Sequence, residues 1–247
     1  IETSLNHHII GQQRAIHQLI ESLESLAQFP HPHRPKGVYL LTGSSGIGKT
    51  ETAKFLAETM HKHFIKLDMS EYSDTTSVNK IIGSSPGYVG YDQQSTLFHD
   101  MILYPDSILL LDEIEKANPQ VMHLFLQVFD EGVLKDNHHH IISFKDTIII
   151  MTSNVTKQNQ SIVGFKKKLP SYQHLESYFS KEFLNRIDEI IEYQTLQKQH
   201  LQQILKNQTP IPLTESMMED ILKDYDVNQG ARTLLKQMKK YLVSKNR

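Results

Sequence analysis

The sequence lacks cysteine, so none of its 247 residues can form a disulfide bond. The same absence excludes thiolate zinc sites and cysteine nucleophiles, and it fits the reducing cytoplasm. No apolar run approaches the ~20 residues that a membrane-spanning helix needs. The chain also opens without the basic and apolar stretches that are typical of a secretion signal. We therefore expect a cytoplasmic protein that has no membrane partner.

An excess of positive charge is missing as well. Lys and Arg number 26 and Asp and Glu number 28, which gives a net charge of -2. Nucleic-acid binding through bulk positive charge is therefore disfavoured, and we expect no nucleic-acid partner. The chain is 38% hydrophobic and 22% charged, as is typical of a folded globular protein. Its length suits one α/β domain of roughly 150–200 residues and a smaller domain.

Short apolar runs alternate, in the first part of the chain, with segments whose apolar residues recur at helical spacing. Strands that alternate with helices favour a parallel sheet covered by helices on both faces. After residue 194 only helical patterns remain. We therefore predict an α/β domain over residues 1–194 and a small, mainly helical domain over residues 195–247. The predicted strands cover residues 38–42, 64–67, 108–111, 147–151 and 189–193, and the predicted helices cover residues 11–27, 49–60, 121–129, 197–206, 214–224 and 231–243.

Residues 43–50 match the phosphate-binding pattern G-x-x-x-x-G-K-[ST], between a predicted strand and a predicted helix. Glycines allow successive N–H groups to turn inward around phosphates, and the start of a helix adds positive dipole. We expect Lys49 to reach the β- and γ-phosphates and the Thr50 hydroxyl to ligate Mg²⁺. The predicted phosphate-binding loop consists of Gly43, Ser44, Ser45, Gly46, Ile47, Gly48, Lys49 and Thr50.

Two acidic residues follow directly on the apolar run 108–111. We expect Asp112 to help hold Mg²⁺, directly or through water. Glu113 is expected to orient or deprotonate the water that attacks the terminal phosphate. Such a pair can also simply begin the next helix, but the phosphate-binding pattern in the same chain favours the catalytic interpretation.

Several further motifs occur in order along the chain: Ile9–Gln12, Asp68–Tyr72, Gly87–Tyr91, Leu111–Lys116, Met151–Asn154, Phe183–Asp188 and Gly230–Arg232. Together they resemble those of AAA+ ATPases, and in particular the second ATPase module of the Clp-type protein unfoldases. The resemblance covers nearly the whole chain. It implies an α/β P-loop AAA+ domain followed by a small helical lid, with ATP and Mg²⁺ as cofactors. It also implies a module excised from a longer protein, with a truncated lid.

The resemblance implies roles for residues outside the phosphate-binding loop. Ile9 and Ile10 resemble the apolar pair that packs on the adenine. Asn154 resembles the first sensor, whose amide reaches the γ-phosphate or the attacking water. Arg186 resembles the arginine finger, which acts on the nucleotide of a neighbouring subunit and thereby implies a homo-hexameric ring. Arg232 resembles the second sensor, which contacts the phosphates of its own subunit.

Both arginines also have a simpler interpretation from the residues alone. Arg186 can form a surface ion pair with Asp188 or Glu189, and Arg232 can be a surface charge at the start of a helix. A planar guanidinium nevertheless suits the charge that develops during phosphoryl transfer.

Two loops resemble those that face the central channel of the Clp ring and handle unfolded polypeptide. Tyr88 lies between glycines, and by resemblance its aromatic ring grips the substrate chain. The second loop is the turn between residues 134 and 141. It holds His138, His139 and His140 where the family has a glycine-rich, basic segment, so we expect a solvated loop tip there, with metal binding as the less favoured alternative.

Val163, Gly164 and Phe165 form an apolar segment in a polar, lysine-rich stretch. They resemble the loop by which Clp unfoldases dock into pockets of a ClpP-type peptidase, although such a segment can also fold onto its own domain. We therefore predict an ATP-dependent unfoldase and translocase that feeds substrate to a ClpP-type peptidase. Two alternatives stay open: a ClpB-like disaggregase without a protease partner, and a weakly active module that binds ATP to hold a ring together.

Overall fold

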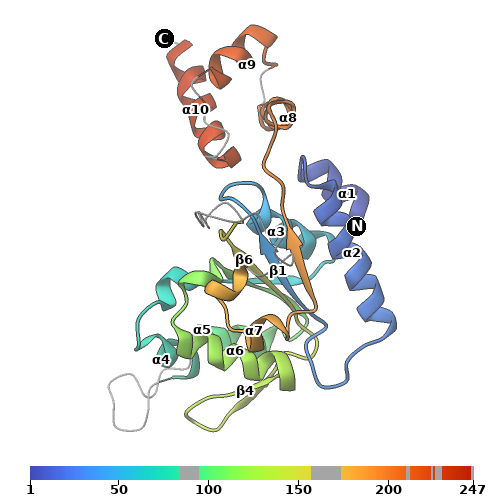
Figure 1. The fold of residues 1–247 in the computed structure, drawn as a ribbon, viewed down its shortest axis with the longest axis vertical. Coiled ribbons are helices and arrows are strands. Elements are labelled where there is room, and N and C mark those ends of the chain that lie inside the picture. The colour runs from blue at the N-terminus through green and yellow to red at the C-terminus, as the bar shows by residue number, and fades with distance from the viewer. Residues whose placement is uncertain (84–94, 157–173, 210–211, 224, 226–229, 246–247) are drawn as a thin grey trace, which may run out of the picture.

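Within the described residues, five parallel strands form the central sheet of the computed structural model, in the order β2-β3-β6-β1-β7 (Figure 1). The structure describes residues 1–83, 95–156, 174–209, 212–223, 225 and 230–245. The prediction of a parallel sheet between helices is confirmed. The strands are β1 Gly37–Thr42, β2 His63–Asp68, β3 Ser107–Asp112, β6 Ile148–Ser153 and β7 Glu189–Glu192.

The sheet is covered on both faces, and this explains why its central strands read as unbroken apolar runs. Every residue of β1, β3 and β6 is buried. Successive side chains of a strand point to opposite faces, so Leu109 packs in one core cluster and Leu110 in the other. The first cluster includes helix α6 and the second includes helices α2 and α3.

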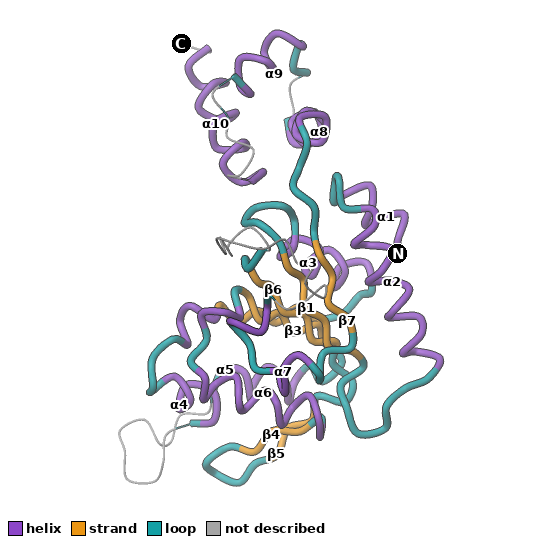
Figure 2. The backbone as a smooth tube through the Cα atoms, in the orientation of Figure 1, coloured by secondary structure: helices purple, strands orange, loops and turns teal. Residues whose placement is uncertain are grey.

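The helices that precede β7 in the chain flank the sheet, as Figures 1 and 2 show. Helix α6 begins after Asn118, whose side chain accepts a hydrogen bond from the Gln120 N–H, and it ends at Gly132 in the left-handed conformation. Within the described residues, three short 3-10 helices lie between the larger elements. The helices are α1 Glu2–His8, α2 Gln13–Gln28, α3 Lys49–Thr59, α4 Ser77–Ile82, α5 Thr96–Leu103, α6 Pro119–Glu131 and α7 Lys181–Leu184, with 3-10 helices Met69–Tyr72, Ile114–Lys116 and Leu175–Ser177.

The predicted second channel loop is the tip of an antiparallel hairpin, formed by β4 (Val133–Lys135) and β5 (Ile141–Ser143). We expected a solvated loop tip here. The structure shows in addition that Asp136 holds the tip in place. The buried Asp136 carboxylate accepts hydrogen bonds from the N–H groups of His138 and His140 and lies 2.9 Å from Nδ1 of His140. In the part of the chain that the structure describes, no group of three or more metal-ligating side chains is arranged to hold a metal ion.

The described residues after β7 contain three helices: α8 Lys198–Gln208, α9 Glu215–Leu222 and α10 Gly230–Lys245. In Figure 1 they stand beyond the end of the sheet at which β7 finishes. Leu201 and Leu205 of α8 and Leu234 of α10 are buried in the same cluster as helices α2 and α3. The division into two domains at residue 194 stays a prediction.

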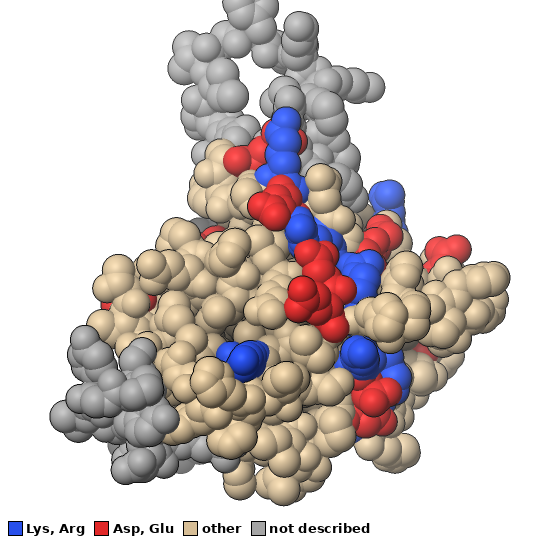
Figure 3. Space-filling view, turned by 90° about the horizontal axis from the view of Figure 1, so that it is seen from below, with Lys and Arg blue, Asp and Glu red and all other residues tan. Residues whose placement is uncertain are grey.

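The face of the molecule shown in Figure 3 carries charges of both signs, side by side along one band, and much of the remaining surface is uncharged. Over the described residues, no helix is long and apolar enough to cross a membrane.

Candidate nucleotide site

The phosphate-binding loop leads from the end of β1 directly into α3, as the sequence predicts. Gly48 precedes the helix with φ 107°, a backbone conformation that a residue with a side chain adopts only under strain. Lys49 begins the helix and is 5% exposed. Its Nζ donates to the carbonyl oxygens of Gly43 at 2.6 Å and Ser44 at 2.7 Å, and lies 3.1 Å from Oδ1 of Asn154. The ammonium is thus held by the loop itself, next to Asn154.

Burial lowers the pKa of Lys49 from its ordinary 10.5 to about 8, although the carboxylates of Glu115, Asp112 and Glu113 act in the opposite direction. A phosphate bound nearby favours the charged ammonium and raises this pKa again. Nucleotide binding and proton uptake at Lys49 are therefore linked.

We expect nucleotide affinity to fall as the pH rises through about 8, because neutral Lys49 does not attract phosphate. At about pH 8.5 nucleotide binding is expected to take up part of a proton. Titration calorimetry in two buffers of different ionisation enthalpy measures this uptake. The same titration at about pH 7, where Lys49 is protonated before and after binding, is the control. Equal proton uptake at both pH values would contradict the assignment.

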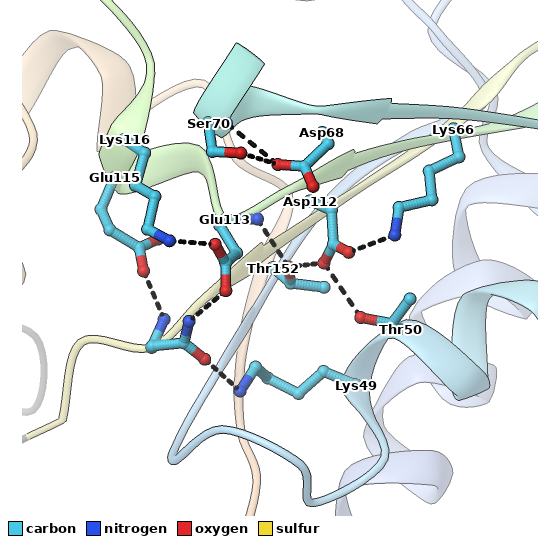
Figure 4. Close-up of polar contacts among 11 residues, drawn as sticks. Lys49, Thr50, Lys66, Asp68, Ser70, Asp112, Glu113, Glu115, Lys116 and Thr152 are labelled. Atoms are coloured by element: carbon cyan, nitrogen blue, oxygen red, sulfur yellow. Dashed lines mark hydrogen bonds and ion pairs between the residues drawn. The ribbon is translucent and has the colours of Figure 1, made fainter. Parts of the chain in front are cut away.

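Asp112 ends β3 at the edge of the sheet where the phosphate-binding loop begins (Figure 4). Its Oδ1 accepts hydrogen bonds from the hydroxyls of Thr50 at 2.9 Å and Thr152 at 2.5 Å, and its Oδ2 lies 2.7 Å from Nζ of Lys66. Burial acts to raise the pKa of Asp112, but these three donors outweigh it and hold the pKa below its ordinary value. A hydroxyl and an ionised carboxylate are oxygen ligands that Mg²⁺ prefers, so the donor set fits this ion.

Glu113 follows Asp112 with φ 57° and ψ 52°, the left-handed conformation that is rare for a residue with a side chain. Its N–H donates to the Thr152 hydroxyl at 3.0 Å, which fixes this backbone. Its two carboxylate oxygens have separate partners: Oε1 accepts from Nδ2 of Asn154 at 3.0 Å, and Oε2 pairs with Nζ of Lys116. Backbone strain of this kind is concentrated at functional sites.

Asn154 connects Lys49 of the phosphate-binding loop with Glu113. Its amide contacts Lys49 through Oδ1 and Glu113 through Nδ2, while its own N–H donates to Oε1 of Glu115 at 3.0 Å. The resemblance suggested Asn154, and the structure brings it to this position just beyond β6. Sequence reasoning gave no role to Glu115 or Lys116, since nothing in their spacing indicates which polar group each one reaches.

A cavity of about 590 Å³ lies beside these groups. Ile9, Ile10 and Arg232, which the resemblance assigns to the nucleotide, line this cavity, and both isoleucines are buried. Gly43 and Ser44 are not among the described lining residues, and they act here through the carbonyl groups that hold Lys49. The lining also includes residues that sequence reasoning missed: His8, Glu51, Lys66, Asp68, Thr152, Leu196, Ile204, Asn207, Gln208, Ala231 and Leu235.

The start of α10 packs directly on the phosphate-binding loop. The Ala231 N–H donates to the Gly46 carbonyl oxygen at 2.7 Å. A Cβ atom on Gly230 would lie only 2.3 Å from the Ser45 carbonyl oxygen, so only glycine permits this approach. The contact brings Arg232 to the cavity, which supports the sensor interpretation over a helix-terminal surface charge.

Arg186 is absent from the described residues that line the cavity. Its Nε donates to Asp130 at 2.6 Å and its Nη2 lies 3.1 Å from a Glu182 oxygen. The simpler interpretation named Asp188 or Glu189 as its partners. Asp188 instead pairs with Arg34, which also donates to the backbone carbonyl of Arg186 at 2.7 Å. The backbone at Arg186 is therefore fixed, while its side chain lies at the surface.

Two predicted sites lie outside the described residues. These are the channel residue Tyr88 and the peptidase-docking segment Val163, Gly164 and Phe165.

A family model described as "AAA domain (Cdc48 subfamily)" matches residues 34–190. The chain is 42% identical, over 83% of its length, to the ATP-dependent Clp protease ATP-binding subunit ClpE of Bacillus subtilis. It is 38% identical to ClpE of Streptococcus pneumoniae over 96% of its length, and 39% identical to the chaperone protein ClpB of Prochlorococcus marinus over 93%.

These matches cover 31%, 35% and 27% of the three relatives, so the chain spans about a third of their length or less. The predictions of an AAA+ fold and of a Clp-type ATPase are confirmed. The chain belongs to the AAA family of ATPases, in its Cdc48 subfamily, and is homologous to a segment of ClpE and ClpB.

Proposed function

We propose that this chain hydrolyses ATP with the help of Mg²⁺ and uses the energy to unfold and translocate polypeptides as part of a homo-hexamer. The observation that carries the proposal is the convergence of Lys49, Glu113 and Asn154 beside the cavity, where Asn154 lies within hydrogen-bond distance of both Lys49 and Glu113. Such an arrangement unites a phosphate-binding cation, a base and a polar group that orients water.

Separate residues bind the phosphates and the Mg²⁺ ion in the proposed mechanism. The loop N–H groups and Lys49 bind the phosphates, and Lys49 exchanges the carbonyls of Gly43 and Ser44 for phosphate oxygens. Thr50 and Asp112 hold Mg²⁺, which when bound neutralises the charge that develops on the transferred phosphoryl group.

The base and the two arginines complete the proposed site. Glu113 accepts a proton from the attacking water, and Asn154 orients this water. Ile9 and Ile10 pack on the adenine, and Arg232 contacts the phosphates from α10. Arg186 completes the site of the neighbouring subunit.

We further propose that the unfolded chain, gripped by Tyr88, passes to a ClpP-type peptidase that docks on Val163, Gly164 and Phe165. Two observations support this partner: the apolar segment in a polar stretch, and relatives named as ATP-binding subunits of the Clp protease. The second candidate is a disaggregase without a protease, favoured by the identity of 39% to a chaperone protein ClpB. The pairing of Glu113 with Asn154 argues against the third alternative, a weakly active assembly module.

Replacing Phe165 by alanine distinguishes the first two candidates. A docking phenylalanine contributes about 1.5–3 kcal/mol per loop, and a ring that presents several loops multiplies the effect. We expect Phe165→Ala to abolish degradation of a tagged folded reporter by the assembled full-length protein and a ClpP-type peptidase. ATP turnover and unfolding of the reporter should persist.

The matched control is Phe29→Ala, which removes another phenylalanine that is 74% exposed. Degradation by this variant should equal that of the wild type. Normal degradation by Phe165→Ala, or no binding of the peptidase by the wild-type protein, would reject the peptidase partner and favour the disaggregase.

A further inference from the structure

Lys66 lies at the proposed Mg²⁺ site, although no motif of the sequence gives it a role. It belongs to β2, which pairs in parallel with β3, and its side chain lines the same cavity as Asp112. Figure 4 shows it reaching along the sheet edge toward the Asp112 carboxylate. Its Nζ lies 2.7 Å from Oδ2 of Asp112.

The two oxygens of Asp112 are used differently. Oδ1 accepts the two hydroxyl hydrogen bonds, from Thr50 and Thr152, whereas Oδ2 faces the Lys66 ammonium. The residue Asp112 is only 8% exposed, and an ionised carboxylate in such a place needs a counter-charge. Lys66 provides this charge in the described structure.

We propose that Lys66 is an internal counter-cation that competes with Mg²⁺ for Asp112 and thereby sets the Mg²⁺ concentration that the site requires. This inference rests on the proposed role of Asp112 as a Mg²⁺ ligand. Lys66 is a positioning residue: its ion pair with Oδ2 holds the Asp112 carboxylate in place until the metal arrives.

The properties of the lysine fit this role. Its ammonium is a compact charge on a flexible stem, and its side chain is 41% exposed, so the charge can swing into solvent when a divalent ion binds. Two cations beside one carboxylate repel each other, and this repulsion opposes Mg²⁺ binding. Neither of the two other lysines near the site pairs with Asp112 in the described structure: Lys49 is held by the carbonyl oxygens of Gly43 and Ser44, and Lys116 pairs with Glu113.

The test compares three variants of the assembled full-length protein. Lys66→Met removes the charge and keeps the length of the stem, while Lys66→Arg keeps the charge. Lys36→Met is the matched control, since Lys36 is similarly exposed but pairs with Asp106 and Asp146, outside the cavity lining. The measurement is binding of a fluorescent ADP analogue during a Mg²⁺ titration, which requires no hydrolysis.

We expect Lys66→Met to lower the Mg²⁺ midpoint about fivefold, as suits the loss of one partly exposed charge pair. Lys66→Arg and Lys36→Met should keep the wild-type midpoint. In EDTA without nucleotide, Lys66→Met should unfold at a lower temperature than the wild type, and Mg²⁺ with ADP should close this difference.

An unchanged or higher midpoint in Lys66→Met, or weaker ADP binding at saturating Mg²⁺, would overturn the inference, the latter result indicating that Lys66 binds phosphate. If Lys66→Met does not fold, Lys66→Gln replaces it in the same measurements. A further variant, Asp112→Asn, distinguishes a failure of the Lys66 inference from a failure of the proposed Mg²⁺ site. A wild-type Mg²⁺ midpoint in Asp112→Asn would reject the role of Asp112 as a Mg²⁺ ligand.

Discussion

Replacing Glu113 by glutamine is expected to lower the rate of ATP hydrolysis by roughly 10²-fold or more, because a positioned general base is lost. Glutamine has nearly the same shape and can still contact Asn154, so the backbone at this position should be unchanged. Lys49, Thr50 and Asp112 are untouched, and ATP affinity should therefore remain near the wild-type value.

Turnover and affinity are to be measured separately on the assembled full-length protein. Glu131→Gln is the matched control, because this acid lies exposed at the end of α6 and contacts Gln127. It should leave both quantities unchanged. Near-normal turnover in Glu113→Gln would remove Glu113 from the mechanism.

Neither carboxylate oxygen of Glu113 is without a partner, since Asn154 lies on one side and Lys116 on the other. If Glu113 is the base, as we propose, an attacking water must take the place of one of these partners. The Lys116 side chain is half exposed, so a rotation into solvent is enough to separate it from Glu113.

The fold follows from the sequence where burial on both faces leaves a simple pattern. The unbroken apolar runs of β3 and β6 predict these strands to within one or two residues. Four of the described helices, α1, α4, α5 and α7, were not predicted, and α1 and α5 show the physical reasons. Helix α1 has seven residues and buries only Leu5, which leaves no periodicity. Helix α5 is apolar on several sides, with Ile102 and Leu103 exposed, so its pattern does not distinguish an inner face.

Some parts of the candidate site could likewise be predicted from the sequence, and others could not. Lys49, Thr50 and Asp112 are predictable because each belongs to a local pattern that follows a strand. The contacts of Lys66 and Lys116 are not, because they depend on strand register and on side-chain rotation at the edge of the sheet. The sequence alone does not indicate which carboxylate a lysine side chain will contact. The partners Asp130 and Glu182 of Arg186 are set by the packing of α6 against α7, and they were missed for the same reason.

Replacing Arg186 by alanine is expected to lower hydrolysis in the assembled protein by about 10³-fold, the order of magnitude that an arginine finger contributes. Arg186 does not line the cavity of its own chain within the described residues, so the nucleotide affinity of the dissociated subunit should be unchanged. Arg34 holds the backbone carbonyl of Arg186, and this contact survives the substitution. Arg14→Ala, at an exposed position of α2, is the matched control and should keep wild-type turnover.

A mixing experiment tests whether Arg186 acts on the neighbouring subunit. Every interface of an Arg186→Ala ring lacks the finger, and every interface of a Lys49→Ala ring lacks a competent phosphate site. When the two variants are mixed in equal amounts, about a quarter of the interfaces combine an intact site with an intact finger from the next subunit. Turnover should then rise above that of either variant alone. If Arg186 acted on its own nucleotide, every subunit of a mixed ring would remain defective. Mixed rings that show no recovery at any ratio would therefore contradict action between subunits.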